Sequence, residues 1–185
     1  MKKIFATFAF LSMFAASPLM AQAPASNQAA PASTQNLPNG ASSISETFGD
    51  WMVGCESRTT GIVCSMTQQR PADNQTMVAI KLDLSKEGNL SGFVVLPFGV
   101  LATKPITFRI DDTRTVITSN IRTCMPFGCV VPIAFDKTTI AALRSGKMIK
   151  IGAQNSTPGE EPIQGFAISL TGFSTAYDRV LALSK

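Results

Sequence analysis

The sequence predicts a mainly β protein: an antiparallel β-sandwich, or a curved, barrel-like sheet, with two short helices at its periphery. Residues 46–185 consist mostly of short runs rich in β-branched, aromatic and aliphatic residues, and several runs alternate between apolar and polar positions as half-buried strands do. Turn-forming residues separate these runs at short intervals, which favours antiparallel hairpins. Nine predicted strands and two helices therefore indicate a sandwich or a strongly curved sheet.

The first 21 residues have the pattern of a cleavable secretory signal. Lys2 and Lys3 precede a mostly apolar run, Ile4–Ala16, and small or neutral residues lead up to Ala21, after which we expect cleavage. The run is too short to span about 30 Å of hydrocarbon, and no later segment offers about 20 uninterrupted apolar residues. We therefore expect an exported protein without a transmembrane segment, located in the periplasm, on the outer membrane or at the cell surface.

Residues 22–45 differ sharply in composition from residues 46–185. They are rich in Ala, Pro, Ser, Gln and Asn, with no charge and almost no large apolar side chain. Such a stretch buries too little surface to offset the entropy of ordering it. The sequence therefore predicts a disordered leader over 22–45 and a single domain over 46–185, which has the ordinary size of one domain.

The expected charge of the exported chain argues against nucleic acid as a partner. Removing Lys2 and Lys3 from the 16 basic residues leaves 14 against 12 acidic ones, a net charge of +2. Nucleic-acid binding needs a clustered basic face, and the remaining Lys and Arg residues are scattered along the chain.

The predicted elements succeed one another along the domain with turns at 87–89, 111–112 and 157–159. Asp136 is placed to cap a first helix, with Gly146 ending it, and apolar residues at helical spacing define a second. The expected helices are Lys137–Arg144 and Ser174–Leu183, and the expected strands are Phe48–Cys55, Gly61–Gln68, Thr76–Leu84, Leu90–Leu96, Ile106–Ile110, Val116–Ile121, Cys129–Phe135, Lys147–Ala153 and Ile163–Leu170.

Four cysteines, an even number, lie in the exported part of the chain: Cys55, Cys64, Cys124 and Cys129. In an oxidising compartment we expect them to be paired as structural disulfides. Three connectivities are possible. The local one, Cys55 with Cys64 and Cys124 with Cys129, suits two hairpin-like segments and is favoured.

Metal, redox and common catalytic chemistry find little support in the residues. The chain has no histidine, and eight residues separate Cys55 from Cys64, so zinc is disfavoured. No two cysteines have the spacing of a thioredoxin-like motif. A Ser-His-Asp triad and a Cys-His pair are excluded, the carboxylates at 111–112 and 160–161 lie in polar turns, and no phosphate-binding or dinucleotide motif is present. We expect a protein that is not an enzyme and that uses no cofactor or metal.

Two segments are candidate contact surfaces. Met125 and Phe127 lie inside the short loop between Cys124 and Cys129, where a disulfide would hold them at low entropic cost. Phe98 lies in an apolar run that Pro97 and Gly99 would bend. The more ordinary outcome for these side chains is to fold back over the edge of the core, and the alternative is that they face solvent and bind a partner.

Four motifs give the chain a resemblance to a known family. They are Phe48–Cys55 at the start of the domain, Leu96–Val100 in its middle, Cys124–Cys129, and Ile168–Phe173 near its end. In this order, and with both cysteine pairs, they resemble the invasion-associated locus B family over essentially all of residues 46–185.

The resemblance implies a secreted, envelope-associated bacterial protein that promotes attachment to and entry of host cells, erythrocytes among them, and virulence. It supplies no catalytic residues. The expected partner is a component of the host-cell surface or of the bacterial envelope. Two functions stay open: noncatalytic binding to host cells, and a periplasmic binding or structural module that acts on envelope components.

Overall fold

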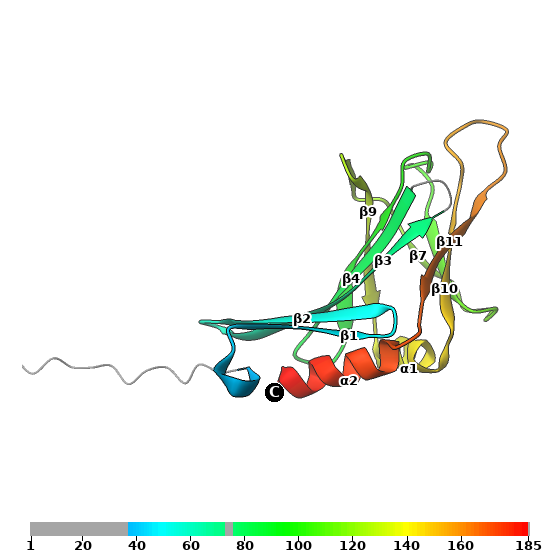
Figure 1. Cartoon of the computed structure of the whole chain (residues 1–185). Coiled ribbons are helices and arrows are strands. Elements are labelled where there is room, and N and C mark those ends of the chain that lie inside the picture. The colour runs from blue at the N-terminus through cyan, green and yellow to red at the C-terminus, as the bar shows by residue number, and fades with distance from the viewer. Residues whose placement is uncertain (1–36, 73–75, 185) are drawn as a thin grey trace, which may run out of the picture. The chain divides into compact units, whose positions relative to one another are not determined.

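A computed structural model describes residues 37–72 and 76–184. The expected signal peptide and the first part of the expected leader, residues 22–36, lie outside the described residues. The ordered chain forms two antiparallel sheets and two α-helices, which confirms the predicted mainly β sandwich (Figure 1). In the part that the structure describes, both sheets are open and end in edge strands.

The larger sheet has the order β1-β2-β3-β4-β5-β9-β8 and the smaller has the order β11-β10-β6-β7. Their strands are β1 Ser43–Phe48, β2 Trp51–Arg58, β3 Gly61–Ala72, β4 Thr76–Leu84, β5 Leu90–Leu96, β6 Ile106–Ile110, β7 Ile117–Ser119, β8 Thr123–Met125, β9 Gly128–Phe135, β10 Met148–Ala153 and β11 Ile163–Ser169. The helices are η1 Pro38–Gly40, α1 Lys137–Ser145 and α2 Phe173–Leu183.

The ordered fold begins earlier than predicted, so the leader boundary at residue 45 is wrong. Strand β1 starts at Ser43, and Leu37 is only 1% exposed. Leu37 is the large apolar residue in this polar stretch, and burying it offsets part of the entropy of ordering residues 37–42. Ile44 and Phe48 also pack against the core, and β1 supplies the edge partner that the β2 backbone needs.

The predicted strand Phe48–Cys55 is in fact a hairpin. Phe48 ends β1, Trp51 begins β2, and the two residues pair across the turn. Gly49 has a positive φ of 58°, a conformation that glycine adopts without a steric penalty, and it allows this tight reversal. The turn was not predicted because only Gly49 and Asp50 separate the large apolar residues Phe48 and Trp51, so the segment has the composition of one strand.

Helix α1 starts at its predicted residue with the predicted cap and extends one residue beyond its predicted end, to Ser145. The Asp136 side chain accepts a hydrogen bond of 2.7 Å from the Thr139 N–H, and Gly146 ends the helix. Ile140 and Leu143 are buried, as expected from their spacing. Helix α2 begins one residue before its predicted start.

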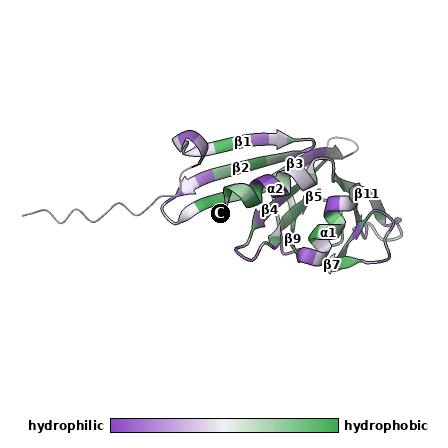
Figure 2. Ribbon diagram, turned by 90° about the horizontal axis from the view of Figure 1, so that it is seen from below, coloured by the Kyte–Doolittle hydropathy of each residue, from purple (hydrophilic) through white to green (hydrophobic). Residues whose placement is uncertain are grey.

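One hydrophobic core connects both sheets and both helices. Leu82 and Val94 of the larger sheet lie in the same buried cluster as Phe108, Ile151 and Phe166 of the smaller sheet. Helix α2 runs along the inner face of β1, β2 and β3, as Figures 1 and 2 show. There the Trp51 and Phe173 rings form a T-shaped pair at a centroid distance of 5.3 Å, and both side chains are fully buried.

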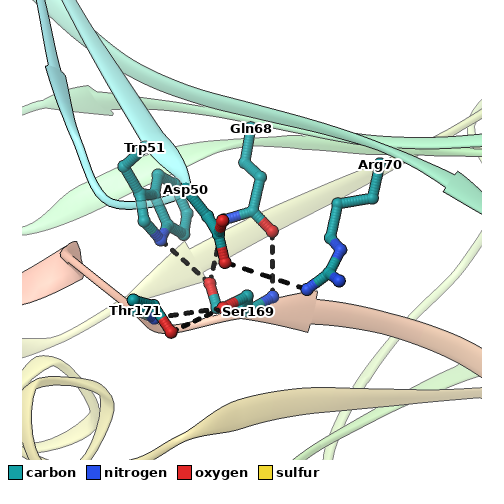
Figure 3. A network of polar contacts seen from close by, with 6 residues as sticks. All are labelled: Asp50, Trp51, Gln68, Arg70, Ser169 and Thr171. Atoms are coloured by element: carbon teal, nitrogen blue, oxygen red, sulfur yellow. Dashed lines mark hydrogen bonds and ion pairs between the residues drawn. The ribbon is translucent and has the colours of Figure 1, made fainter.

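A buried polar network joins the two sheets at Ser169 (Figure 3). The Ser169 carbonyl oxygen accepts hydrogen bonds of 2.9 Å from the Trp51 indole N–H and from the Gln68 side-chain amide, while the Ser169 N–H donates to the Gln68 side-chain oxygen, also at 2.9 Å. Gln68 thus pairs with the β11 backbone as a neighbouring strand would. The Trp51 indole N–H, the Gln68 side-chain amide and the Ser169 backbone groups thus all have hydrogen-bond partners, although Gln68 is only 3% exposed.

Two glycine turns meet beside this network. The Asp50 N–H donates a hydrogen bond of 3.1 Å to the Thr171 carbonyl oxygen. A Cβ atom on Gly172 would lie 1.9 Å from the Phe48 carbonyl oxygen, and one on Gly49 would lie 2.6 Å from the Thr171 carbonyl oxygen. Because no larger residue fits at such distances, the Phe48–Trp51 and Thr171–Phe173 segments can touch only through glycine.

An ion pair fastens β1 to α2. The Arg179 guanidinium donates two hydrogen bonds to the Glu46 carboxylate, at 2.6 and 2.7 Å, and each side chain is about one-third exposed. These hydrogen bonds lower the pKa of Glu46 below its ordinary value. The bidentate geometry is the strong form of such a pair.

The contact between the two turns predicts a large effect for Gly172→Ala. Its Cβ would overlap a backbone oxygen that cannot move independently, so we expect a loss of about 3 kcal/mol or more in the free energy of unfolding, measured by urea denaturation with Trp51 fluorescence.

Gly159→Ala is the matched control, because Gly159 has the same φ of 84° but no atom within 4 Å of the added Cβ. It should lose only about 1 kcal/mol, the cost of the backbone conformation. Equal losses in the two variants would show that the turn-to-turn contact contributes nothing.

The Glu46–Arg179 pair predicts a pH-dependent stability. Because folding lowers the pKa of Glu46, the pair stabilises the fold above the unfolded-state pKa of about 4.3 and loses this effect as the pH falls through the lower folded-state value. Glu46→Gln should therefore lower the urea midpoint at pH 7, and the difference from the parent protein should shrink as the pH falls below about 4.

Glu56→Gln provides the comparison, because Glu56 pairs with Arg58 in a mostly exposed position, with side chains 61% and 59% accessible. Its effect at pH 7 should be smaller. A deficit of Glu46→Gln that persists undiminished at pH 2.5 would contradict an electrostatic origin.

Candidate functional site

The three residues predicted as a contact surface all face solvent. Phe98 and Phe127 each expose 61% of their surface and Met125 exposes 44%. Phe98 lies in the loop after β5, Met125 is the last residue of β8, and Phe127 lies in the turn between β8 and β9. Both segments lie at the end of the sheets away from the helices (Figure 1). We call these three residues the aromatic end. The more ordinary expectation, that they fold back over the core, is wrong.

Strand pairing places the two segments of the aromatic end side by side. Leu96, the last residue of β5, pairs with Cys129 near the start of β9. Phe98 lies two residues after Leu96, and Phe127 lies two residues before Cys129. Gly128 tightens this contact, because a Cβ there would lie 2.5 Å from the Leu96 carbonyl oxygen. The register of β5 and β9 therefore brings two distant sequence motifs together.

A disulfide closes the turn that carries Met125 and Phe127. Cys124 and Cys129 are paired residues of β8 and β9, and their sulfur atoms are bonded. Cys129 is only 3% exposed, so the bond fixes the base of the turn to the sheet while its tip stays in solvent. A fixed, exposed aromatic side chain loses little conformational entropy when it binds.

The loop that carries Phe98 is anchored on its other side. The Ser156 N–H donates to the Gly99 carbonyl oxygen and the Leu101 N–H donates to the Gln154 carbonyl oxygen, each at 2.8 Å. Val100 is 6% exposed and pairs with Asn155 through an isolated bridge. Val100 thus holds the loop to the fold, and Phe98 points away from it.

The second disulfide has a different environment. Cys55 and Cys64 are paired across β2 and β3 with Cα atoms 4.1 Å apart, and they are 1% and 5% exposed. They belong to the core on the side that α2 covers. Both bonds have the local connectivity that the sequence favoured, but only Cys124–Cys129 lies at a solvent-exposed turn.

Two of the acidic residues considered for catalysis, Asp111 and Asp112, bond to neighbouring groups of the smaller sheet. Asp111 accepts hydrogen bonds from the backbone N–H groups of Lys147 and Met148, at 3.1 and 3.0 Å. Asp112 accepts one of 2.7 Å from Lys150, which lowers the pKa of the Asp112 carboxyl. Within residues 37–72 and 76–184, no group of three His, Cys, Asp or Glu side chains is arranged to hold a metal ion.

Sequence reasoning missed the polar network around Ser169 as a potential site. Gln68 and Ser169 are buried, and Asp50 and Arg70 lie at its margin with 3.9 Å between their charged atoms. The buried groups bond to one another rather than converging on open space, so the network is structural. A hollow of about 510 Å³ on the outer face of the smaller sheet includes Arg109 and Lys150, and Lys150 is already paired with Asp112.

Among the described residues, no helix has the length and apolar character needed to cross a membrane.

The fold and the aromatic end define a class: a small, disulfide-containing β-sandwich protein that displays aromatic side chains on two anchored loops at one end. Comparison with known proteins gives the family. The model of the invasion associated locus B (IalB) protein family matches residues 51–181. The chain belongs to this family.

Relatives and a solved structure agree with this assignment. The chain is 40% identical to invasion protein B of Bartonella bacilliformis over 189 residues, covering 100% of both chains. It is 36% identical to an invasion protein B homolog of Brucella abortus over 152 residues, which covers 81% of this chain and 86% of the relative. The crystal structure of invasion associated protein B from Bartonella henselae matches with a TM-score of 0.72 and 40% identity, covering 76% of this chain and 96% of that one.

The turn between β8 and β9 predicts a local role for its disulfide. Replacing Cys124 and Cys129 together by serine should lower the free energy of unfolding by about 2 kcal/mol, the chain-entropy value for a ring of this size. Amide hydrogen exchange at residues 123–129 should become faster, while exchange in β10 should stay unchanged.

The double change Cys55→Ser and Cys64→Ser should instead accelerate exchange throughout the larger sheet, because it places hydroxyl groups in the core. If exchange at residues 125–128 were unchanged in the variant that lacks Cys124 and Cys129, the sheet alone would order the turn.

Proposed function

We propose that this protein is exported to the bacterial cell surface and that it promotes host-cell attachment and entry by noncatalytic binding through the aromatic end. The partner is a component of the host-cell surface. The Cys55–Cys64 and Cys124–Cys129 disulfides support export, because such bonds persist in oxidising compartments. The names of the relatives, invasion protein B and its homolog, support a role in invasion.

The observation that carries this proposal is the exposure of two phenylalanines at the same end of the sheets. Fully burying such a side chain stabilises a protein by about 1.5–3 kcal/mol, so a rigid loop that presents one to water forgoes this gain. Phe98 and Phe127 do so from two separate loops at the same end, and Met125 extends the apolar surface. Aromatic and Met side chains are enriched at the centres of protein interfaces.

The surroundings of the aromatic end fit a binding surface rather than a catalytic one. Exposed Lys104 lies in the same loop as Phe98, and exposed Arg122 is hydrogen-bonded to Val130 beside the disulfide turn. Charged groups around an apolar centre are typical of the rim of an interface. Because both loops are anchored to the sheets, they would lose little conformational entropy on binding a partner. A smaller entropy loss raises the affinity.

The double change Phe98→Ser and Phe127→Ser tests this surface. Both side chains are mostly exposed, so the fold should keep its stability to within about 1 kcal/mol, while binding of the purified protein to host-cell membranes, including erythrocyte membranes, should fall at least about tenfold. Binding is measured by cosedimentation with membranes.

Met148→Ser is the control, because Met148 is 37% exposed on a different part of the surface. It should bind as the parent does. Retained binding in the double variant would rule out the aromatic end, whereas failure of antibodies and external protease to reach the protein on intact bacteria would rule out direct contact with host cells.

A further inference from the structure

The edges of the two sheets differ in how they are protected from pairing with another chain. Strands β7 and β8 are edge strands of only three residues each. On β11, the side chain of Gln68 occupies the backbone groups of Ser169 at one end of the strand, and toward the other end the register with β10 shifts between Ile151 and Ala153. Strand β1 is an edge of six residues that pairs with β2 in an unbroken register, and Figure 2 shows it at the border of the larger sheet. Long unprotected edges are ready templates for strand addition.

The pairing of β1 with β2 fixes which backbone groups face outward. The Ser57 N–H donates to the Ser42 carbonyl oxygen, so residues 42 and 57 form a hydrogen-bonded pair of the ladder. In an antiparallel ladder these pairs alternate with pairs that do not bond to each other. The N–H and C=O groups of Ser43, Ser45 and Thr47 therefore point away from β2, along the free edge, and the described residues offer them no hydrogen-bond partner.

The side chains of β1 lack the usual protection of an edge. Ser43, Ser45 and Thr47 are exposed, small and uncharged, and β1 contains no lysine, proline or bulge. Its single charge, Glu46, belongs to the other face and is bound by Arg179. The edge-facing residues of β1 thus carry neither a charge nor a bulky side chain.

We propose that β1 pairs with β1 of a second copy of this chain, antiparallel and about a two-fold axis at Ser45. In this register Ser45 lies opposite Ser45 of the second copy, Ser43 lies opposite its Thr47, and Ile44 lies opposite its Glu46. All three outward-facing residues then meet partners that hydrogen-bond along the edge, and no like charges oppose each other. The strand is therefore complementary to itself, which is what a two-fold interface requires.

The dimer would join the two larger sheets into one continuous sheet. Each subunit would keep its own aromatic end, so a partner that is present in many copies on a surface could be held at two points at once. The pairing itself depends on β1 alone and holds or fails independently of what the aromatic end binds.

The test is the mass of the exported chain, starting at Gln22, measured by sedimentation equilibrium over a range of concentrations. The parent should show a reversible monomer–dimer equilibrium. Ser45→Lys places two ammonium groups opposite each other at the axis and should raise the dimer dissociation constant at least about tenfold. Ser65→Lys is the control: Ser65 lies on the same face, but on interior strand β3 and opposite Asp83, and the dimer should persist.

Cysteine substitution then tests the register. Ser45→Cys should give a disulfide-linked dimer on oxidation, because the axis brings the two positions together, whereas Ser43→Cys or Thr47→Cys alone should give little. Circular dichroism checks that each variant is folded. A protein that is monomeric at about 1 mM, or a dimer that Ser45→Lys and Ser65→Lys weaken equally, would overturn the proposal.

Discussion

The hydrogen bonds on the backbone of Ser169 are the constraint on which the arrangement of the two sheets depends. The backbone of β11 at Ser169 is buried where no strand continues the smaller sheet, and buried N–H and C=O groups need partners. The side chains of Gln68 and Trp51 supply them from the larger sheet. Because Trp51 also contacts Phe173, the same point fixes the start of α2, and the helix then covers the inner face of β1, β2 and β3.

The four motifs that gave the family resemblance meet in two places. Phe48–Cys55 and Ile168–Phe173 come together at the Ser169 network and the two glycine turns, where they hold the sheets and α2 in position. Leu96–Val100 and Cys124–Cys129 come together at the aromatic end through the pairing of β5 with β9. One half of the resemblance therefore reflects the fold, and the other half reflects a displayed surface.

Local features of this structure were predictable from the sequence and distant ones were not. Helix α1 carries its own cap at Asp136 and its own stop at Gly146, so its limits follow from neighbouring residues. The disulfides likewise join cysteines within single hairpins. Strand β1 escaped prediction because its polar composition resembles a leader, and only pairing with β2 makes it a strand. The Ser169 network was not predictable, since its partners are 101 and 118 residues away in the chain.

The candidate surface shows the same division. Composition and spacing singled out Phe98, Met125 and Phe127, but whether they face the core or the solvent is decided by neighbours from other segments. Val100 occupies the buried position beside Asn155, and Cys129 occupies the buried position at the base of the β8–β9 turn. The rings of Phe98 and Phe127 are therefore left in solvent. Sequence periodicity carries no information on such competition for interior space.

The local connectivity of the two disulfides has a consequence for how the native cysteine pairs form during oxidative folding. The two bonds span sequence separations of 9 and 5, so each pair can meet as soon as its own hairpin has formed. A mispaired bond such as one between Cys64 and Cys124 would close a loop several times longer, which disfavours it by roughly 1–2 kcal/mol in chain entropy. Loop-closure entropy therefore favours the two native pairs over mispaired bonds between the hairpins.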